Sequence, residues 1–334
     1  MSDPLLAVAF LLAAAVSLSA SWLLVVSLER VGARLDLSEA LLGMLAALAA
    51  DAPEITAAVT ALAHHDQRIG AGVVIGSNVF NLAALIGLAG VVAARVALHR
   101  RVIELAGGVA LWMAAVTLAV VVGLCSPAVG LLLVIAVLAP YIVILGMSHE
   151  RLRRLPLPDA WAGWLLAAVT EEELELELAI HPSRGHTRDV LLTLGAVALV
   201  VGASVAMEQT AADLGSRHAV PPIVVGALIL AGVTSLPNAV AGVYLAVRGR
   251  AAAVLSTSFN SNAINNLAGL LIPTSLLGLA APSGQTTYIA VSYVAMTVLV
   301  LATSYLNHGL RRGAGLLIIC AYLAFAGVLL AVAY

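Results

Sequence analysis

The sequence predicts an all-α polytopic membrane protein of ten transmembrane helices, arranged as two inverted repeats of five helices each. Three observations lead there: apolar runs of bilayer length recur along the chain, nearly all arginines fall on one side of the predicted membrane, and two polar motifs recur at one fixed spacing. Of the 334 residues, 62% are hydrophobic and 10% are charged, which is too little charge to cover a soluble domain. The apolar runs are continuous rather than alternating, so they are predicted to be helices that satisfy their own backbone groups in lipid.

The ten predicted spans fall into two groups of five, separated by a polar segment. We assign residues 1–147 to the first five-helix repeat, 148–189 to a cytoplasmic loop and 190–334 to the second repeat. The acidic run 171–177 in this loop is read as solvated, with a regulatory cation site as the alternative. The predicted spans are 5–28, 39–63, 70–94, 102–123, 127–147, 190–207, 220–246, 253–280, 287–306 and 313–333.

The arginines fix an orientation. All 16 basic residues are arginine, and with the N-terminus outside, 14 of them lie on the inner side, while only Arg68 and Arg217 lie outside. Cytoplasmic loops carry an excess of basic residues, so both termini are predicted to be outside. The inner arginines are Arg30, Arg34, Arg95, Arg100, Arg101, Arg151, Arg153, Arg154, Arg184, Arg188, Arg248, Arg250, Arg311 and Arg312.

Polar residues of the first half recur in the second half after 184 positions, as in Pro53 and Pro237 (237 − 53 = 184). Because each half has an odd number of spans, the second half must enter the membrane upside down. Inverted repeats of this kind are typical of secondary transporters, whose sites lie near the midplane between the repeats. The same shift places Glu54 on Asn238, Ser77 on Ser261, Asn78 on Asn262 and Asn81 on Asn265.

Two carboxylates occupy the middle of the second predicted span. Asp51 and Glu54 are three residues apart, so on a helix they share a face. A charge at a helix centre costs roughly 2.5–3.5 kcal/mol on insertion scales, whereas the other acidic residues are mostly placed at span ends or in loops. Pro53 interrupts the helix between them and frees a carbonyl that can serve as a ligand. Carboxylates, amides and carbonyls are ligands for hard cations such as Ca²⁺ and Na⁺, and a protonated or hydrogen-bonded packing role is the alternative.

The third and eighth predicted spans each add a Ser-Asn-x-x-Asn cluster. Gly76 opens the first cluster and is expected to allow a close backbone approach. Small polar residues also act as hydrogen-bonding contacts between membrane helices, so for Ser77, Asn78, Ser261 and Asn262 this role stays open beside ion binding.

These segments resemble the alpha repeats of the cation/Ca²⁺ exchanger superfamily, which includes the Na⁺/Ca²⁺ exchangers. The family pattern is roughly G-T-S-L-P-E followed by G-S-N-x-x-N or G-S-N-x-x-D, once per half. The first half reads Ala50-Asp51-Ala52-Pro53-Glu54 and Gly76-Ser77-Asn78-Val79-Phe80-Asn81, and the second reads Thr234-Ser235-Leu236-Pro237-Asn238 and Asn260-Ser261-Asn262-Ala263-Ile264-Asn265.

The resemblance implies a Na⁺/Ca²⁺ exchanger-like fold in which the second, third, seventh and eighth spans bind ions. The paired glutamates of the family map to Glu54 and Asn238. The second half thus supplies no negative charge to the implied site, while Asp51 stands where the family usually has Ser, and we infer that Asp51 replaces the lost carboxylate. The alternative is that Asp51 points elsewhere and that the site holds only Glu54. The implied metal ligands are Asp51, Glu54, Ser77, Asn81, Thr234, Ser235, Asn238, Ser261 and Asn265.

The expected function is secondary antiport of Ca²⁺ against Na⁺ or H⁺ by alternating access at a midplane site. A monovalent cation/H⁺ antiporter with Glu54 as proton carrier is the first alternative, and a degenerate member that does not transport is the second. An intramembrane enzyme using Asp51 and Glu54 as acid and base is disfavoured. We expect no cofactor, no nucleic-acid partner and no required oligomer; the partners are small cations and the lipid bilayer, in a prokaryotic plasma membrane.

Overall fold

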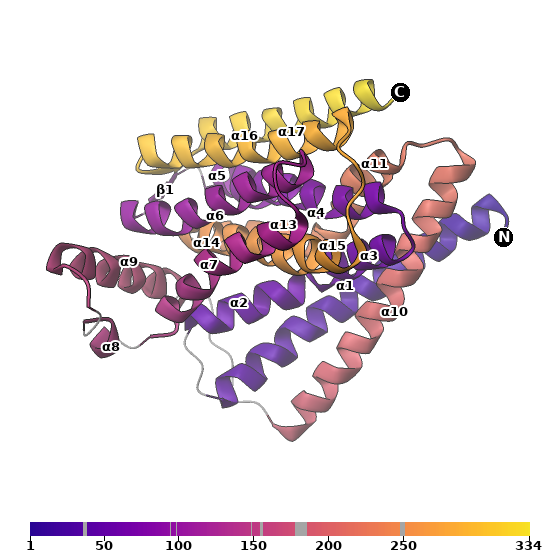
Figure 1. Ribbon diagram of the computed structural model, residues 1–334. Coiled ribbons are helices and arrows are strands. Elements are labelled where there is room, and N and C mark those ends of the chain that lie inside the picture. Colours follow the sequence, from indigo (N-terminus) through magenta and orange to yellow (C-terminus); the bar gives the residue numbers. More distant parts are fainter. Residues whose placement is uncertain are drawn as a thin grey trace.

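The computed structural model describes residues 1–35, 39–93, 95–97, 99–147, 149–153, 156–177, 186–247 and 251–334, and these form a helical bundle (Figure 1). The first half contains α1 (Asp3–Arg34), α2 (Glu39–Ala50), α3 (Ala52–Ala63), α4 (Gln67–Asn81), the π-helix η1 (Leu82–Gly87), α5 (Leu88–Ala93), strand β1 (Arg95–Ala97), α6 (Arg100–Val121) and α7 (Pro127–Leu145). Two helices follow, α8 (His149–Arg153) and α9 (Asp159–Glu177). The second half contains α10 (Thr187–Arg217), α11 (Pro222–Val224), η2 (Val225–Leu230), α12 (Ala231–Thr234), α13 (Leu236–Val247), α14 (Ala251–Ile264), η3 (Asn265–Leu271), α15 (Ile272–Leu277), α16 (Gly284–Leu306), β2 (Gly309–Arg311) and α17 (Arg312–Ala333).

Seven described helices are long and apolar enough to cross a membrane, or eight if the bent pair Pro222–Thr234 and Leu236–Val247 counts as one span. The two further predicted spans, 39–63 and 253–280, correspond to α2 with α3 and to α14 with η3 and α15. The segment predicted as a loop, 148–189, contains the helix α9, where Glu171 pairs with Arg101 at 2.8 Å. The side chains of 172–177, and Arg154, Arg184, Arg248 and Arg250, lie outside the described residues.

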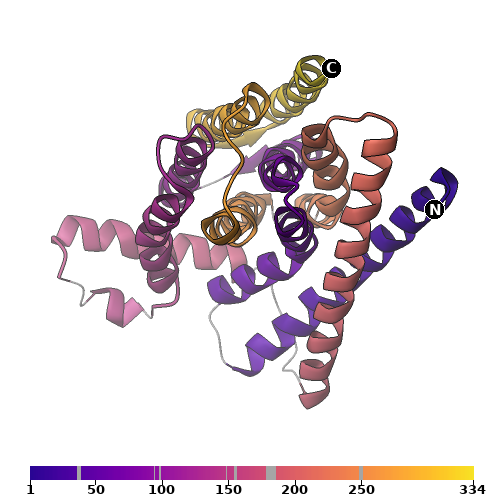
Figure 2. The ribbon, with the colours of Figure 1, turned by 45° about the vertical axis from the view of Figure 1, so that its right-hand side comes forward.

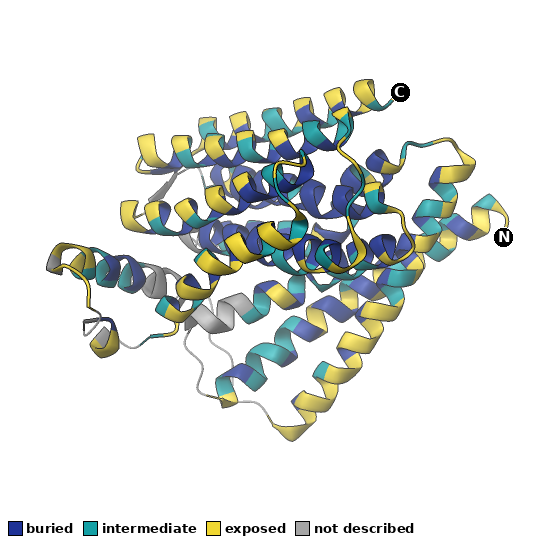
Figure 3. Cartoon of the chain, in the orientation of Figure 1, coloured by how far each residue is buried: buried dark blue, intermediate teal, exposed yellow. Residues whose placement is uncertain are grey.

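The bundle has a buried centre and a lipid-compatible exterior (Figure 3). In the span Gln67–Ala93, 94% of the apolar window is buried, against 17% for Arg312–Ala333. Outer helices instead expose large apolar side chains, such as Leu132 on α7, to their surroundings. An outward apolar surface of this kind fits a membrane solvent and not water.

The long helices α1 and α10 lie side by side at one edge of the bundle, and α16 and α17 cover the opposite edge (Figures 1 and 2). Hydroxyl and ionic pairs join α1 to α10 along their length. Ser17 and Ser204 share a hydrogen bond of 2.7 Å, and Arg30 pairs with Asp189 at 3.5 Å. The polar pairs therefore hold α1 and α10 in one antiparallel register.

Similar local irregularities of the backbone accompany both copies of the sequence motifs. The helix is interrupted at Asp51, between α2 and α3, and again at Ser235, between α12 and α13. A π-helix begins directly after Asn81, and another begins at Asn265. The two motifs therefore share a local structure and not only a residue pattern. π-Helical turns of this kind often occur at functional sites.

Gly76 is needed for packing, as its position in the motif suggested. The backbone of α4 lies directly against that of η2, and a Cβ atom on Gly76 would lie 2.5 Å from the Cα of Ala227. The contact is with backbone, which cannot rotate away. The close approach brings the third predicted span onto the start of the seventh.

Replacing Gly76 by Ala is expected to destabilise the fold by about 1–3 kcal/mol, because the added methyl group overpacks a backbone contact. The measurement is the melting temperature in detergent, followed by size-exclusion chromatography. Gly108→Ala on α6 is the matched control, since nothing lies within 4 Å of its added Cβ, and this change should preserve or slightly raise stability. Equal melting temperatures for both variants would contradict the packing role of Gly76.

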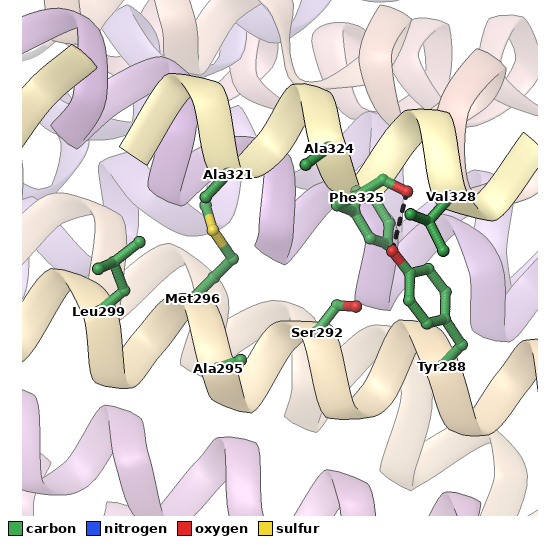
Figure 4. A pocket seen from close by; sticks show the side chains of 9 residues that line it. All are labelled: Tyr288, Ser292, Ala295, Met296, Leu299, Ala321, Ala324, Phe325 and Val328. Atoms are coloured by element: carbon green, nitrogen blue, oxygen red, sulfur yellow. Dashed lines mark hydrogen bonds between the residues drawn. The ribbon is translucent and has the colours of Figure 1, made fainter. Parts of the chain in front are cut away.

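A groove of about 290 Å³ lies between α16 and α17, lined mainly by apolar side chains (Figure 4). Inside it, the Tyr288 hydroxyl donates to the Phe325 carbonyl at 3.1 Å, and the two rings are stacked 5.8 Å apart. All its lining residues come from these two helices, so the groove is separate from the helices that carry Asp51 and Glu54.

Candidate cation site

The two predicted carboxylates lie at the break between α2 and α3, in the buried centre of the bundle. Asp51 occupies the break itself and Glu54 the first turn of α3, and both are 0% exposed. The break is there because Pro53 has no N–H to donate to the Ala49 carbonyl, four residues earlier. The sequence therefore places both carboxylates beside an irregular backbone, where side chains and carbonyls can converge.

The freed carbonyl was predicted as a possible ion ligand, but it accepts a hydrogen bond from a side chain of α1. The Ser21 hydroxyl lies 3.0 Å from the Ala49 oxygen and 3.3 Å from the Ala50 oxygen, as donor to both. Ser21 is fully buried. A serine in an apolar first span carries no strong signal in sequence, and only the packing of α1 against the break assigns it this role.

Both carboxylates of the first half contact neutral groups of the second half. Asp51 Oδ1 accepts hydrogen bonds from Asn238 Nδ2 at 2.8 Å and from Ser261 Oγ at 2.7 Å. Glu54 Oε1 accepts one from Ser235 Oγ at 2.9 Å. Asp51 thus lies beside Asn238, the residue that the repeat aligns with Glu54.

Asn81 joins the same network from α4. Its Nδ2 donates to Ser261 Oγ and to Asn262 Oδ1, both at 3.2 Å, and its Oδ1 lies 3.5 Å from Asn238 Nδ2. Of the other predicted residues, Thr234 donates to the Leu230 carbonyl of its own helix at 2.9 Å. Its hydroxyl hydrogen is therefore used inside the helix.

Several buried polar atoms at this place lack a hydrogen-bond partner within the described chain. One oxygen of each carboxylate is among them, Asp51 Oδ2 and Glu54 Oε2, as are Ser77 Oγ and both polar atoms of the Asn265 side chain. They come from α3, α4 and η3, which pack against one another, and from the break before α3. Unpaired buried groups of this density need a physical explanation, and a bound cation is one that would satisfy the oxygens.

Two residues not expected from the sequence, Asn266 and Tyr293, extend the network outward from Asn78. Asn78 Nδ2 donates to Asn266 Oδ1 at 3.0 Å, and Asn266 Nδ2 donates to the Tyr293 hydroxyl at 3.1 Å. Asn262 Nδ2 donates to the Asn78 carbonyl at 3.1 Å. Asn78 and Asn262 therefore link helices, the alternative that the sequence left open. Asn266 could have been found from the sequence, because two consecutive asparagines, Asn265 and Asn266, are unusual in an apolar span.

Glu208, which the sequence places at the end of the sixth predicted span, lies within a longer helix and is buried. The predicted sixth span ends at 207, whereas α10 continues to Arg217 and carries Glu208 inside a packed contact, 1% exposed. The apolar run alone sets the predicted boundary, and it cannot reveal a helix that stays packed past a charged residue.

Ser21→Ala is expected to weaken cation binding two- to tenfold, because the break loses a hydrogen bond worth about 0.5–1.5 kcal/mol. The measurement is the apparent Ca²⁺ affinity of the purified chain. Ser19→Ala is the matched control: Ser19 is exposed on the same helix and should tolerate the change. If both variants bind like the unmodified chain, Ser21 does not position the break.

The fold is the one seen in solved structures of cation exchangers. The structure of the "H+/Ca2+ Exchanger CAX" matches with a TM-score of 0.70 at 15% identity, over 98% of this chain and 86% of that chain. A structure of "the sodium-calcium exchanger NCX_Mj" matches with a TM-score of 0.59 at 16% identity, over 98% of this chain and all of that one.

The sequence comparison agrees with this fold. The model of the family described as "Sodium/calcium exchanger protein" matches residues 5–149 and 189–331, and the chain belongs to that family. A curated relative, the "Sodium/potassium/calcium exchanger Nckx30C" of Drosophila melanogaster, is 27% identical over 148 residues. That match covers 42% of this chain and 17% of the relative, so the chain corresponds to a small part of the relative's length.

Proposed function

We propose that this protein is a secondary active antiporter that moves Ca²⁺ against Na⁺ or H⁺ at a site containing Asp51 and Glu54. The observation that carries the proposal is the burial and the hydrogen bonding of these two carboxylates. Each is fully buried, each uses one oxygen to accept hydrogen bonds from the opposite half, and each keeps the other oxygen free of any partner among the described residues. Family membership supports the same reaction class.

The charge of the site favours a divalent ion. Two ionised carboxylates supply a formal −2, which one Ca²⁺ balances, and the surrounding hydroxyl and amide oxygens are the hard ligands that Ca²⁺ prefers. Within the described residues, no group of three or more His, Cys, Asp or Glu side chains could hold a metal ion. The proposed site therefore depends on two acids completed by neutral oxygens of Ser77, Asn81, Thr234, Ser235, Asn238, Ser261 and Asn265.

The alternating-access mechanism follows from how the site is divided. The charge belongs to the break in the first half, and the hydrogen-bond donors that face it belong to the second half. Movement of one half against the other would part these contacts and open the ion to one side at a time. Bound cation would replace the donors as the partner of the carboxylates.

We also propose ten spans in two inverted halves, with both termini outside and residues 148–189 cytoplasmic. Pairs of residues far apart in sequence support this arrangement of the spans, since both members of each pair fall on one predicted side, while the orientation rests on the arginines. Arg217 pairs with Asp3 at 3.0 Å on the outer side. On the inner side, Arg95 is paired in register with Arg311 through β1 and β2.

Single cysteines test the orientation, in a chain from which Cys125 and Cys320 have been removed. A cysteine at Asp66 should react with an impermeant maleimide added outside intact cells, and one at Glu150 should react only after the cells are opened. The opposite pattern would invert the proposed topology.

Flux into proteoliposomes tests the function. Ca²⁺ uptake should follow an imposed outward gradient of Na⁺ or of H⁺, and the gradient that drives it identifies the coupling ion. Absence of Ca²⁺ movement under both gradients would refute the Ca²⁺ proposal. Na⁺ or K⁺ movement driven by H⁺ alone would instead support the monovalent antiporter, and binding without flux would support a member that does not transport.

The monovalent alternative has its own supporting observation. Glu54 accepts a side-chain hydrogen bond from Ser235 alone among the contacts described for its carboxylate, whereas Asp51 accepts two. A carboxylate with fewer donors is the better proton carrier, since hydrogen bonds to the charged form favour ionisation.

A further inference from the structure

Glu208 is a buried acid that the proposed cation site does not use. It lies on α10, nine residues before the end of that helix at Arg217, and only 1% of its surface is exposed (217 − 208 = 9). Neither of its carboxylate oxygens has a hydrogen-bond partner in the part of the chain that the structure describes. A buried carboxylate without a partner is costly, so Glu208 either holds a proton or needs a positively charged partner.

The nearest such partner is His64, the C-cap residue of α3. Its Nδ1 lies 3.9 Å from Glu208 Oε2, too far for a hydrogen bond but within ion-pair distance. The His64 side chain is 50% exposed, so it can exchange protons with water while Glu208 stays inside. Histidine is the side chain whose charge normally changes between pH 5 and 8.

Besides His64, the turn after α3 carries the exposed side chains of His65 and Asp66, and Arg68 follows at the start of α4. Two acids, Asp66 in the turn after α3 and Asp213 on α10, lie near enough for their negative charges to repel the Glu208 carboxylate. The part of α1 between residues 4 and 28 has no titratable side chain, and neither do α11 and η2. Protonated His64 would therefore meet a negative environment, with the buried carboxylate at its centre.

A charged pair would draw the two helices together. A hydrogen bond between a protonated imidazole and a carboxylate is about 2.7–2.9 Å long, so the present separation would shorten by about 1 Å. His64 ends the helix whose first turn carries Glu54, and the ten residue steps from Glu54 to His64 span about 15 Å of one helix. Ala57, Ala58 and Ala61, between these ends, are fully buried and leave no flexible side chain to absorb the movement.

We propose that His64 and Glu208 form a proton-binding latch, separate from the cation site, in which a proton taken up by His64 ties α3 to α10 and slows cation exchange. The proton is held on His64 Nδ1 and shared with Glu208 Oε2, and its release to water returns the contact to its open form. No third ligating side chain joins this pair among the described residues, so the chemistry fits a proton and not a metal ion.

A stability experiment tests the latch without any need for transport, so it stays informative if the proposed function fails. Melting temperatures of the purified chain, His64→Asn, Glu208→Gln and the double variant are compared at about pH 5.5 and about pH 7.5. The stabilising interaction needs one proton shared by the pair, so a coupling between the two substitutions is expected at the lower pH and should weaken at the higher pH, where the pair loses that proton. Absence of coupling at the lower pH overturns the latch.

Transport adds a second readout that rests on the proposed function. Acid on the side that His64 faces should slow exchange by about three- to tenfold. This factor corresponds to an interaction stronger than an exposed ion pair and weaker than a buried charged hydrogen bond. His64→Asn and Glu208→Gln should each remove this inhibition, and His65→Asn, the exposed neighbour, should retain it. Inhibition that survives both latch variants, or that His65→Asn removes, overturns the proposal. His64 is half exposed, so its variant does not depend on repacking of the core.

Discussion

Glu54→Gln is expected to abolish cation exchange while leaving the fold intact. The amide keeps the shape of the side chain and can still accept from Ser235, but it removes half of the negative charge that the site offers. A buried cation that loses one charge partner loses on the order of 3–5 kcal/mol, which corresponds to at least a hundredfold in affinity. The measurement is Ca²⁺ and Na⁺ flux in proteoliposomes, with size-exclusion profiles to check folding.

Two controls make this result specific to the site. Glu29→Gln neutralises an acid near the inner end of α1 and should leave flux near its normal level. Ser235→Ala removes the hydrogen bond to Glu54 and one neutral oxygen of the proposed site but no charge, and it should reduce flux without abolishing it. Normal flux in the Glu54→Gln variant would refute the proposed site under both antiporter hypotheses.

Asp51→Ser is expected to lower the apparent affinity for Ca²⁺ by about a hundredfold or more, because the site would keep a single carboxylate for a divalent ion. The effect on a monovalent ion should be smaller, since Glu54 alone can balance it. Affinities measured for both ions in the same preparation separate these outcomes. Unchanged Ca²⁺ affinity would show that Asp51 is not a ligand.

A charge-swap variant tests whether Asp51 replaces the acid that the second half lacks. Asn238 Nδ2 lies 2.8 Å from Asp51 Oδ1, so a carboxylate at position 238 would occupy nearly the same place. Asn238→Glu in the Asp51→Ser background should therefore restore much of the Ca²⁺ affinity. Asn238→Glu alone should not raise the Ca²⁺ affinity above that of the unmodified chain, since a third adjacent carboxylate brings repulsion. Failure of the double variant to recover would argue that position, and not only charge, determines binding.

The sequence predicted most of the helical framework because lipid imposes a simple rule. Every backbone group in the bilayer must be paired within its own segment, so long apolar runs become helices wherever they occur. The ten predicted runs each correspond to a helical stretch of the structure. The rule does not extend to the ends of α10 or to α9, because helices continue beyond the apolar window when tertiary contacts or solvent accept their polar residues.

The candidate site was predicted in part. A proline between two acids, and a motif that recurs after 184 positions, identify Asp51, Glu54 and their partners from residue order alone. The sequence also shows that both acidic residues of the candidate site, Asp51 and Glu54, belong to the first half. It does not show which atoms meet, because contacts between residues nearly 190 positions apart depend on how the two halves dock.

The sequence by itself thus determined a helical membrane framework and a recurring motif whose acidic residues lie only in its first copy, since apolar length and motif spacing are properties of the residue order. Only the tertiary structure decided that Asp51 faces Asn238, that Ser21 takes the carbonyl freed by Pro53, and that Glu208 is buried beneath His64. Each of these contacts joins helices far apart in sequence. Their geometry follows from the packing of small residues such as Gly76, which sets how closely the helices approach.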